Sequence, residues 1–310
     1  MTANRIVNFH SVRDAAWFDD VISFLRSKYT FVDIESLYQY YVGRITLENS
    51  CHITVDDGHK SFYDVVFPVL KRHRVPASIY VSPRICEQKA NYWFQEVQGY
   101  DQNQFKRIIS DMLGVPLNIL EPYSIDSLLK TRSIHQIHEI IERYRKVARA
   151  PQKEFQNMTV QSLKEVERSG LITIGAHTIS HPVLRIEDDA NSQYEISQSV
   201  SELSNLLNRK VEYFTYPNGI PALDFAERER RYLRAIGIRL ALTSEPRNLS
   251  ITDDPTVIPR FAVSDGESRT YLGVKLALSR FWSTLMRLKP NGEYRERLKL
   301  GRTISAAKAN

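Results

Sequence analysis

Two groups of residues in this chain of 310 residues have the types and spacing needed for metal-assisted chemistry. The first is Asp56-Asp57-Gly58, and the second is the pair His177 and His181. Two adjacent carboxylates can divide the work, because one can bind a metal while the other stays free as a base. Two imidazoles one helical turn apart can complete the metal site. Such a set of side chains is typical of a metal-dependent hydrolase.

The runs of sequence around both groups predict that they lie at strand ends. The acidic pair follows the strand-like run 51–55, which we interpret as having alternating faces, and precedes a helix-like run at 62–70. His177 follows the apolar run 171–176. Parallel α/β barrels carry their chemistry at the carboxyl ends of their strands, so both groups are expected at one end of such a barrel.

Four motifs in order give the chain a resemblance to a known family. They are ITVDDG at 53–58, PASIYV at 76–81, HTISHP at 177–182 and YFTYPNG at 213–219. Over roughly residues 53–263, the chain is similar to the polysaccharide deacetylases, which are metal-dependent carbohydrate esterases. Four ordered motifs are far more specific than any one of them alone.

The resemblance implies a role for each matching residue. Asp56 corresponds to the family's general base, and Asp57, His177 and His181 correspond to its metal ligands. One carboxylate and two imidazoles suit a divalent transition metal, with zinc as the first candidate, and leave positions for water and an acetamide oxygen. The resemblance also places the backbone N–H of Asn218 at the tetrahedral oxyanion.

One residue that holds the base in many family members is replaced here. Those members carry an arginine two positions before the proline of the fourth motif, where this chain has Thr215. We expect Arg260, in the strand-like run 257–263, to hold Asp56 instead. The alternative is a surface arginine on an edge strand, because the preceding proline also suits an edge.

The general acid of the family is also missing. Family members often use a C-terminal Leu-x-His histidine, but no histidine follows His181 in this chain. His10, at the end of a strand-like run, or Asp56 returning its proton is then expected to protonate the leaving amine. A structural role for His10 is the alternative.

Composition is consistent with a globular enzyme. Hydrophobic residues make up 42% of the chain, which is enough for a substantial core. The only cysteines, Cys51 and Cys86, form no Cys-x-x-Cys motif, so neither a disulfide framework nor a thiolate zinc site is expected. Because no export signal and no long apolar run are evident, we expect a cytoplasmic location and a precursor substrate, and we expect no nucleic-acid partner.

The alternation of strands and helices favours an α/β fold with a parallel sheet. The family resemblance implies a distorted (β/α) barrel of about seven parallel strands, here with a helical insertion, and the number of expected strands is compatible with it. Strands are expected near 5–10, 51–55, 76–81, 171–176, 211–216, 238–243 and 257–263, and helices near 14–28, 33–43, 62–70, 159–169, 193–208 and 222–236. We divide the chain into a first barrel segment (1–84), a helical insertion (85–155), a second barrel segment (156–265), and an amphipathic helix with a basic tail (266–310).

The insertion at 85–155 is interpreted as a helical lid beside the mouth of the active site. Its helical periodicity is strongest over 134–147. His135 and His138 have the i, i+3 spacing of metal ligands, but they are interpreted as residues of the polar face. The aromatic residues at 92–94 have two alternative roles, stacking on a sugar ring or packing in a core.

The C-terminal segment concentrates positive charge. Residues 280–310 hold eight Lys and Arg and two Glu, and eight minus two gives +6, the net charge of the whole chain. They overlap an apolar stripe formed by Leu272, Leu276, Leu278, Phe281, Trp282, Leu285, Met286 and Leu288. We therefore predict peripheral contact with an anionic membrane through 268–310. The alternative is a helix docked on the barrel, followed by a disordered tail.

The predicted function is removal of N-acetyl groups from amino sugars of a polysaccharide or lipid-linked oligosaccharide precursor, in bacterial surface-polysaccharide biosynthesis. The alternative is a catalytically inactive carbohydrate-binding relative, because the acid histidine is missing. A third interpretation, phosphoryl transfer with magnesium, would prefer an oxygen-rich site and leaves two histidines without a role.

Overall fold

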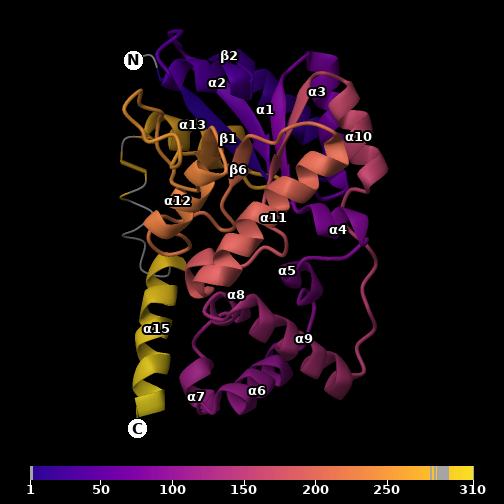
Figure 1. Ribbon diagram of the computed structural model, residues 1–310, viewed down its shortest axis with the longest axis vertical. Helices are drawn as coiled ribbons and strands as arrows, with labels where there is room; N and C mark the ends of the chain where they lie inside the picture. The colour runs from indigo at the N-terminus through magenta and orange to yellow at the C-terminus, as the bar shows by residue number, and fades with distance from the viewer. Residues whose placement is uncertain (1–2, 280, 283, 285–292, 310) are drawn as a thin grey trace.

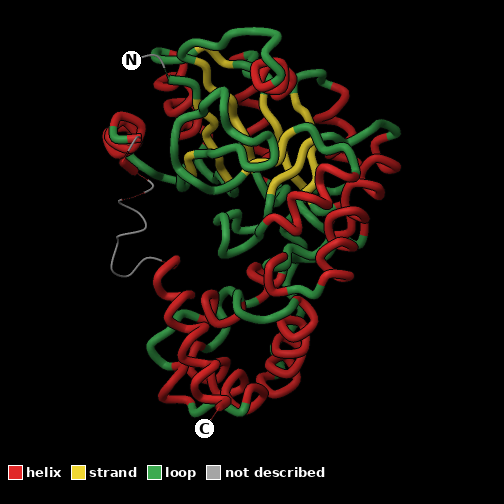
Figure 2. The backbone as a smooth tube through the Cα atoms, turned by 60° about the vertical axis from the view of Figure 1, so that its left-hand side comes forward, coloured by secondary structure: helices red, strands yellow, loops and turns green. Residues whose placement is uncertain are grey.

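The computed structural model describes residues 3–279, 281, 282, 284 and 293–309. Within these residues, all the strands lie in an α/β barrel at one end of the molecule, and the other end is built from helices (Figures 1 and 2). We call the helical end, formed by α5 to α9 together with α15, the helical lobe.

The barrel contains one sheet of parallel strands in the order β7-β6-β5-β4-β3-β1-β8, with β2 paired to β3 beside this path. A parallel bridge between Leu242 of β7 and Ile258, close to β8, brings the two edges of the sheet together. The prediction of a distorted barrel of about seven parallel strands is therefore confirmed. The strands are β1 Arg5–Phe9, β2 Thr30–Phe31, β3 Ser50–Val55, β4 Ala77–Val81, β5 Ile172–Ala176, β6 Tyr213–Thr215, β7 Leu240–Leu242 and β8 Phe261–Ala262.

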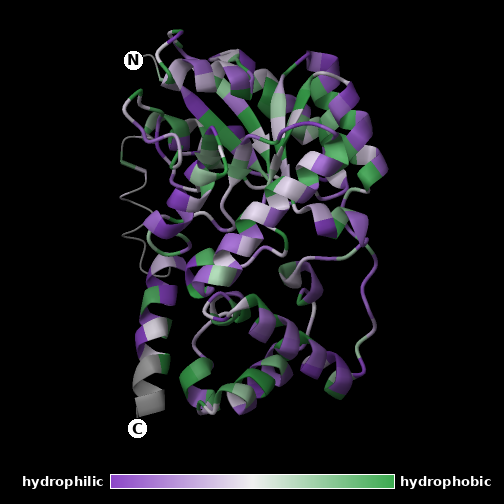
Figure 3. Cartoon of the chain, viewed as in Figure 1, coloured by the Kyte–Doolittle hydropathy of each residue, from purple (hydrophilic) through white to green (hydrophobic). Residues whose placement is uncertain are grey.

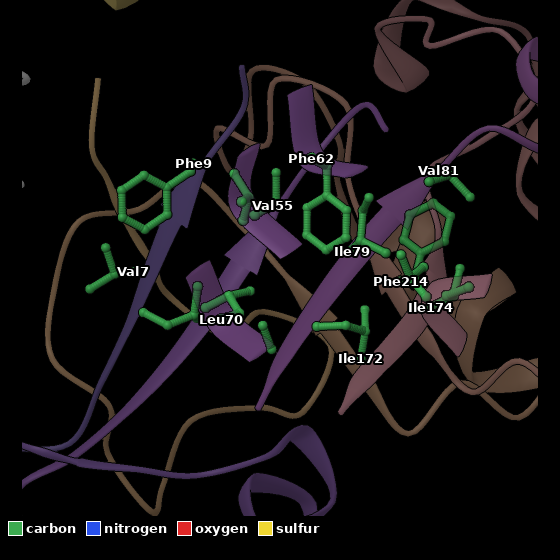
Figure 4. Packing of buried hydrophobic residues seen from close by; sticks show 14 of the residues in the cluster. Val7, Phe9, Val55, Phe62, Leu70, Ile79, Val81, Ile172, Ile174 and Phe214 are labelled. Carbon is green, nitrogen blue, oxygen red and sulfur yellow. The ribbon is translucent and has the colours of Figure 1, made fainter. Parts of the chain in front are cut away.

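The strands β1, β3, β4, β6 and β7 are buried on both faces. The strand predicted at 51–55 is β3, and both of its alternating faces are buried. The physical reason is that side chains fill the barrel interior while helices cover its outside, as is usual for parallel sheets. Figure 4 shows Val55, Ile79 and Phe214, from three different strands, in one packed layer with Phe62.

Helices cover the outside of the barrel, and aspartates begin several of them. Asp14, Asp33 and Asp188 accept backbone N–H groups at the starts of α1, α2 and α11. The cap at Asp188 starts α11 four residues before the predicted position. These helices are α1 Ala15–Arg26, α2 Ile34–Tyr41, the π-helical η1 Phe62–Val66 continuing into α3 Phe67–His73, α10 Val160–Arg168, the 3-10 turn η2 Leu184–Ile186, α11 Asp189–Leu207, α12 Glu227–Ala235 and α13 Arg269–Ala277.

The helical lobe has its own hydrophobic core, and most of its residues lie between β4 and α10 in the sequence. Figure 3 shows hydrophobic and hydrophilic segments alternating along its helices, as expected for helices with one buried face. The C-terminal helix α15 packs beside α8 and contributes Leu300 and Ile304 to this core (Figure 1). A disordered tail is therefore wrong for this part of the chain. The helices of the lobe are α5 Trp93–Glu96, α6 Gln102–Leu113, α7 Leu117–Leu120, α8 Ile125–Leu129, α9 Ile134–Ala148 and α15 Glu293–Ala309. The short helix α4 Pro83–Glu87, which precedes them, packs against α11 of the barrel.

The predicted apolar stripe near the C-terminus divides between two environments. Leu272 and Leu276 of α13 are buried in the barrel core, whereas Phe281 is 66% exposed. Leu285, Met286 and Leu288 lie outside the described residues. In the part of the chain that the structure describes, no helix is long and apolar enough to cross a membrane.

Candidate active site

The candidate site lies where several parallel strands end. In the parallel sheet, Phe9 lies beside Val55, and Ala176 lies beside Phe214. The residues that follow these four positions therefore emerge at the same end of the barrel. A pocket of about 530 Å³ opens there between the barrel and the helical lobe. The barrel contributes His10, Asp57, His181 and Asn218 to its lining, and the lobe contributes residues including Trp93, Phe94, Gln98, Asp126 and Lys130.

Asp57, His177 and His181 form a compact group of potential metal ligands. One ligand atom from each lies within 4.8 Å of the other two, and all three side chains are buried. Asp57 Oδ1 is 3.4 Å from His177 Nε2 and 3.6 Å from His181 Nε2. The structure therefore brings together the three residues that the sequence singled out as ligands.

The turn Asp56-Asp57-Gly58 has a backbone conformation that residues with a side chain rarely adopt. Asp57 and Gly58 both have positive φ, 71° and 64°. A Cβ on Gly58 would lie 2.8 Å from a methyl carbon of Val81, so the glycine is required by close approach as well as by conformation. This turn directs Asp56 and Asp57 to different neighbours.

The two histidines lie on a loop, so their predicted spacing along one turn of helix is wrong. Thr178 and His181 adopt positive φ, which breaks any helical path. Glu195, on α11, accepts hydrogen bonds of 2.9 Å from the backbone N–H groups of Ile179 and Ser180. The loop thus turns His181 back toward His177, and the imidazole centroids are 4.9 Å apart.

A hydrogen bond fixes the tautomer of His177. Its Nδ1 is 2.8 Å from the carbonyl oxygen of Thr215, which can only accept, so Nδ1 donates and Nε2 keeps its lone pair for a cation. Burial by itself lowers the pKa of His177, but the Asp57 carboxylate raises it above its ordinary value. Burial and the neighbouring His177 lower the pKa of His181 to about 3, so this second imidazole is neutral at pH 7.

Asp56 is held by a buried network. Arg260 Nη1 and Nη2 donate to its two oxygens at 2.9 and 2.8 Å, and Asn8 Nδ2 donates to Oδ2 at 3.1 Å. The Arg260 side chain is 1% exposed, so the alternative of a surface arginine is wrong. Thr215, at the position of the usual family arginine, instead contacts His177.

The protonation of Asp56 reflects this network. Burial alone raises the pKa of its carboxyl group, but the Arg260 guanidinium and the nearby His177 more than offset burial. The pKa of Asp56 therefore lies below its ordinary value. The carboxylate is ionised at neutral pH, which is the form that a base requires.

His10 and Asn218 complete the pocket wall on the barrel side. His10 is exposed, lines the pocket with Asp57, and is close enough to both acids to lower the pKa of each, after the opposing effect of burial. Asn218 has a positive φ of 59°. Its side-chain Nδ2 is buried and has no hydrogen-bond partner among the described residues.

The residues present fit a divalent transition metal. Asp57 Oδ1 is buried and accepts no hydrogen bond from the described residues, although it faces two imidazole nitrogens. An orphaned buried carboxylate oxygen is costly unless a cation or a donor satisfies it. Burial alone raises the pKa of Asp57, but His177, His10 and His181 hold it well below the ordinary range. The carboxylate is therefore in its ligating form.

Three residues of the site went unrecognised in the sequence. Asn8 interrupts the apolar run of β1, and a polar residue inside a buried strand is a signal that could have revealed it. Glu195 gave no local signal, because its role depends on a loop that precedes its helix. Trp93 lies in the core of the helical lobe, as one of its two predicted roles states, but its hydrogen bond to the carbonyl oxygen of His181 was not predicted.

The polysaccharide deacetylase family model matches residues 124–241. That segment contains His177, His181 and Asn218, whereas Asp56 and Asp57 precede it. No curated protein sequence matches this chain.

Solved structures of deacetylases share the fold. The deacetylase PplD of Streptococcus pyogenes, in complex with acetate, is 15% identical, with a TM-score of 0.60 over 88% of this chain and 97% of its own. IcaB from Ammonifex degensii is 19% identical, with a TM-score of 0.60 over 91% and 97%. The deacetylase domain of BpsB from Bordetella bronchiseptica is 16% identical, with a TM-score of 0.56 over 85% and 96%.

The chain therefore combines the parallel barrel of these deacetylase structures with an Asp-His-His group at the carboxyl ends of its strands. The comparisons therefore show similarity to the polysaccharide deacetylase family over residues 124–241 and the fold of solved deacetylases over most of the chain.

Proposed function

We propose that this protein is a metal-dependent deacetylase that removes N-acetyl groups from amino sugars of a polysaccharide or lipid-linked oligosaccharide precursor. The observation that carries the proposal is that two adjacent carboxylates contact different partners. Asp57 faces the imidazoles of His177 and His181, and Asp56 faces Arg260. Asp57, His177 and His181 would hold one divalent metal, with zinc as the first candidate, and the bound metal would supply Lewis-acid chemistry to a water and to the acetamide carbonyl.

Asp56 is proposed as the general base. Its two oxygens are fixed by Arg260, and its low pKa keeps it ready to accept a proton from the attacking water. Since Arg260 cannot lose its own proton, it holds the carboxylate without competing as an acid. The role of Arg260 is therefore that of a positioning residue.

Asn218 is proposed to stabilise the tetrahedral oxyanion. Its backbone N–H corresponds to the family donor, and its buried, unpaired Nδ2 in the pocket wall is a second candidate donor. His10, which also lines the pocket, would protonate the leaving amine, and Asp56 returning its proton is the alternative.

The pocket supports an amino-sugar substrate. Phe94 offers a partly exposed ring, and Gln98 and Asp126 offer groups that can hydrogen-bond to sugar hydroxyls. Two of the similar structures, IcaB and the BpsB deacetylase domain, are consistent with a place in bacterial surface-polysaccharide biosynthesis. We also propose that the chain divides into the four segments given above. The last of these segments contacts the second one in space, because α15 packs in the core of the helical lobe.

Acetate release from a panel of free and lipid-linked N-acetylhexosamine oligosaccharides tests this function directly. We expect metal-loaded protein to release acetate from at least one of them. If it binds these glycans yet releases no acetate with zinc, cobalt or nickel, the inactive carbohydrate-binding alternative replaces the proposal.

Contact with an anionic membrane is a further part of the proposal. On α15, Arg295, Lys299 and Arg302 are exposed along one side together with Leu298, whereas Leu300 faces the core. A basic side with an exposed apolar residue is suited to anionic headgroups. A cytoplasmic location next to that membrane would place the enzyme beside a lipid-linked precursor.

A further inference from the structure

The two candidate histidine ligands are supported in different ways. The ring of His177 is fixed by a hydrogen bond from Nδ1 to the Thr215 carbonyl. The Nδ1 of His181 is buried and has no hydrogen-bond partner among the described residues. Metal-binding histidines usually have an outer partner that fixes their orientation, so something other than a ring hydrogen bond must orient His181.

Three aromatic side chains at the start of α5 lie close to the imidazole of His181. The rings of Tyr92, Phe94 and Trp93 lie with their centroids 5.6, 5.0 and 6.5 Å from the imidazole. Trp93 is 2% exposed, and its indole Nε1 donates a hydrogen bond of 3.0 Å to the backbone carbonyl oxygen of His181. That hydrogen bond lies at a residue with a φ of 60°, a left-handed conformation that needs support from its surroundings.

Helix α5, which carries Trp93, is also connected by hydrogen bonds to the loop that holds Asp57. Gln95 exchanges two side-chain hydrogen bonds with Asn157, of 2.8 and 2.9 Å. The next residue, Met158, donates its backbone N–H to the carbonyl oxygen of Gly58 at 2.7 Å. Helix α5 is thus connected to the loop of Asp57 as well as to the loop of His181.

We infer that Trp93 is a positioning residue for the candidate metal ligand His181, so that the helical insertion builds part of the metal site as well as the pocket wall. The indole N–H holds the strained backbone of the ligand, and the aromatic rings restrict its imidazole. This inference rests on the proposed metal site.

The variant Trp93→Phe tests the inference, because it removes the N–H donor and keeps an aromatic ring. Zinc affinity is measured by competition with a chromophoric chelator, and ligand geometry is measured from the visible absorption spectrum of the cobalt(II) form. We expect roughly 10-fold weaker zinc binding, as is common when an outer-shell partner is lost, and an altered cobalt spectrum.

Trp17→Phe is the matched control. Trp17 Nε1 donates a hydrogen bond of 2.8 Å to the carbonyl oxygen of Glu267, away from the Asp-His-His group. The control removes the same kind of hydrogen bond, but away from the candidate metal ligands. Its zinc affinity and cobalt spectrum should therefore match those of the wild type. If Trp93→Phe does not fold, Trp93→Tyr provides the same measurement.

The outcomes separate this inference from the proposed function. If the wild type binds zinc and the Trp93 variant binds it equally well with an unchanged cobalt spectrum, the positioning role is wrong and the metal site stands. Equal weakening in the Trp17 control would also overturn the inference, because the effect would then follow from general stability. If the wild type binds no metal, the proposed metal site itself fails.

Discussion

Arg260 and Asp56 form a buried, two-pronged ion pair although they are 204 positions apart in the chain. The two hydrogen bonds fix the plane of the carboxylate, so its position does not depend on a metal. Asp57, the next residue, makes no such contact with an arginine and faces two histidines. Two neighbouring acids therefore have different partners, and this difference leads to separate predictions for each.

Asp56→Asn is expected to keep the metal and lose most turnover. The amide preserves the shape of the side chain but cannot accept a proton, and general-base contributions are typically about 10²- to 10⁴-fold. Metal content and kcat for acetate release measure the two effects. Asp64→Asn, the same change at an exposed residue, should retain both. Near-normal turnover by metal-loaded Asp56→Asn would place the base elsewhere.

Arg260→Gln is expected to shift the acidic limb of the kcat/KM profile to higher pH. Burial raises the pKa of Asp56 and Arg260 lowers it, so loss of the guanidinium lets the pKa rise and the base protonates at a higher pH. Breaking the buried pair should also destabilise the fold by about 3–5 kcal/mol, measured by chemical denaturation.

Arg260→Lys separates charge from geometry in the same experiment. It keeps the positive charge and cannot make two parallel hydrogen bonds, so we expect a smaller pH shift with a reduced kcat. An acidic limb that stays in place for both variants would show that Arg260 does not set the protonation of Asp56.

Substitution of any one candidate ligand by alanine is expected to remove most of the bound metal. Asp57→Ala, His177→Ala and His181→Ala each take one ligand from a group of three. Elemental analysis of the purified proteins measures the metal content. His59→Ala is the control, because His59 is two residues from Asp57 and hydrogen-bonds to Ser61 outside the group. Full metal content in all three variants would exclude this site.

His10→Ala is expected to lower kcat for acetate release. The change removes the imidazole that lines the pocket and is proposed to donate a proton to the leaving amine. The residual rate would come from Asp56 returning its proton. If the rate is unchanged, His10 is not the proton donor.

Neutralising the exposed basic side of α15 is expected to weaken binding to anionic vesicles. Arg295→Gln, Lys299→Gln and Arg302→Gln together remove three charges, each worth on the order of 1 kcal/mol near such a surface. Co-sedimentation with vesicles containing anionic lipid, at low and high salt, should then fall roughly 10-fold or more.

An equal loss of charge on the barrel controls for net charge. Lys71, Arg72 and Arg74 are exposed near the end of α3, and their replacement by glutamine should leave co-sedimentation close to the wild type. Equal behaviour of the wild type and the α15 variant would remove the membrane role.

Part of this site was predictable because it depends on local order in the chain. Asp57, His177 and His181 each follow a strand, and the ends of parallel strands must meet at one end of a barrel. The sequence by itself therefore determined a parallel α/β fold and singled out the acidic pair and the two histidines, and the resemblance of its motifs to the deacetylases implied the barrel and the role of each residue. Arg260 could also be named as the partner of Asp56, because Thr215 replaces the usual family arginine and Arg260 lies in a strand-like run near it in the order of motifs.

Tertiary structure alone decided how these residues are oriented. The spacing of His177 and His181 suggested a helical turn, but Glu195 accepts N–H groups from the intervening residues and folds them into a loop. The role of Trp93 depends on a chain reversal that brings the insertion back to residue 181, 88 positions away. α15 likewise packs on a lobe that precedes it by more than 100 positions. Local patterns encode periodicity and turn chemistry, whereas contacts between distant segments depend on how all the elements pack together, which no single stretch of sequence specifies.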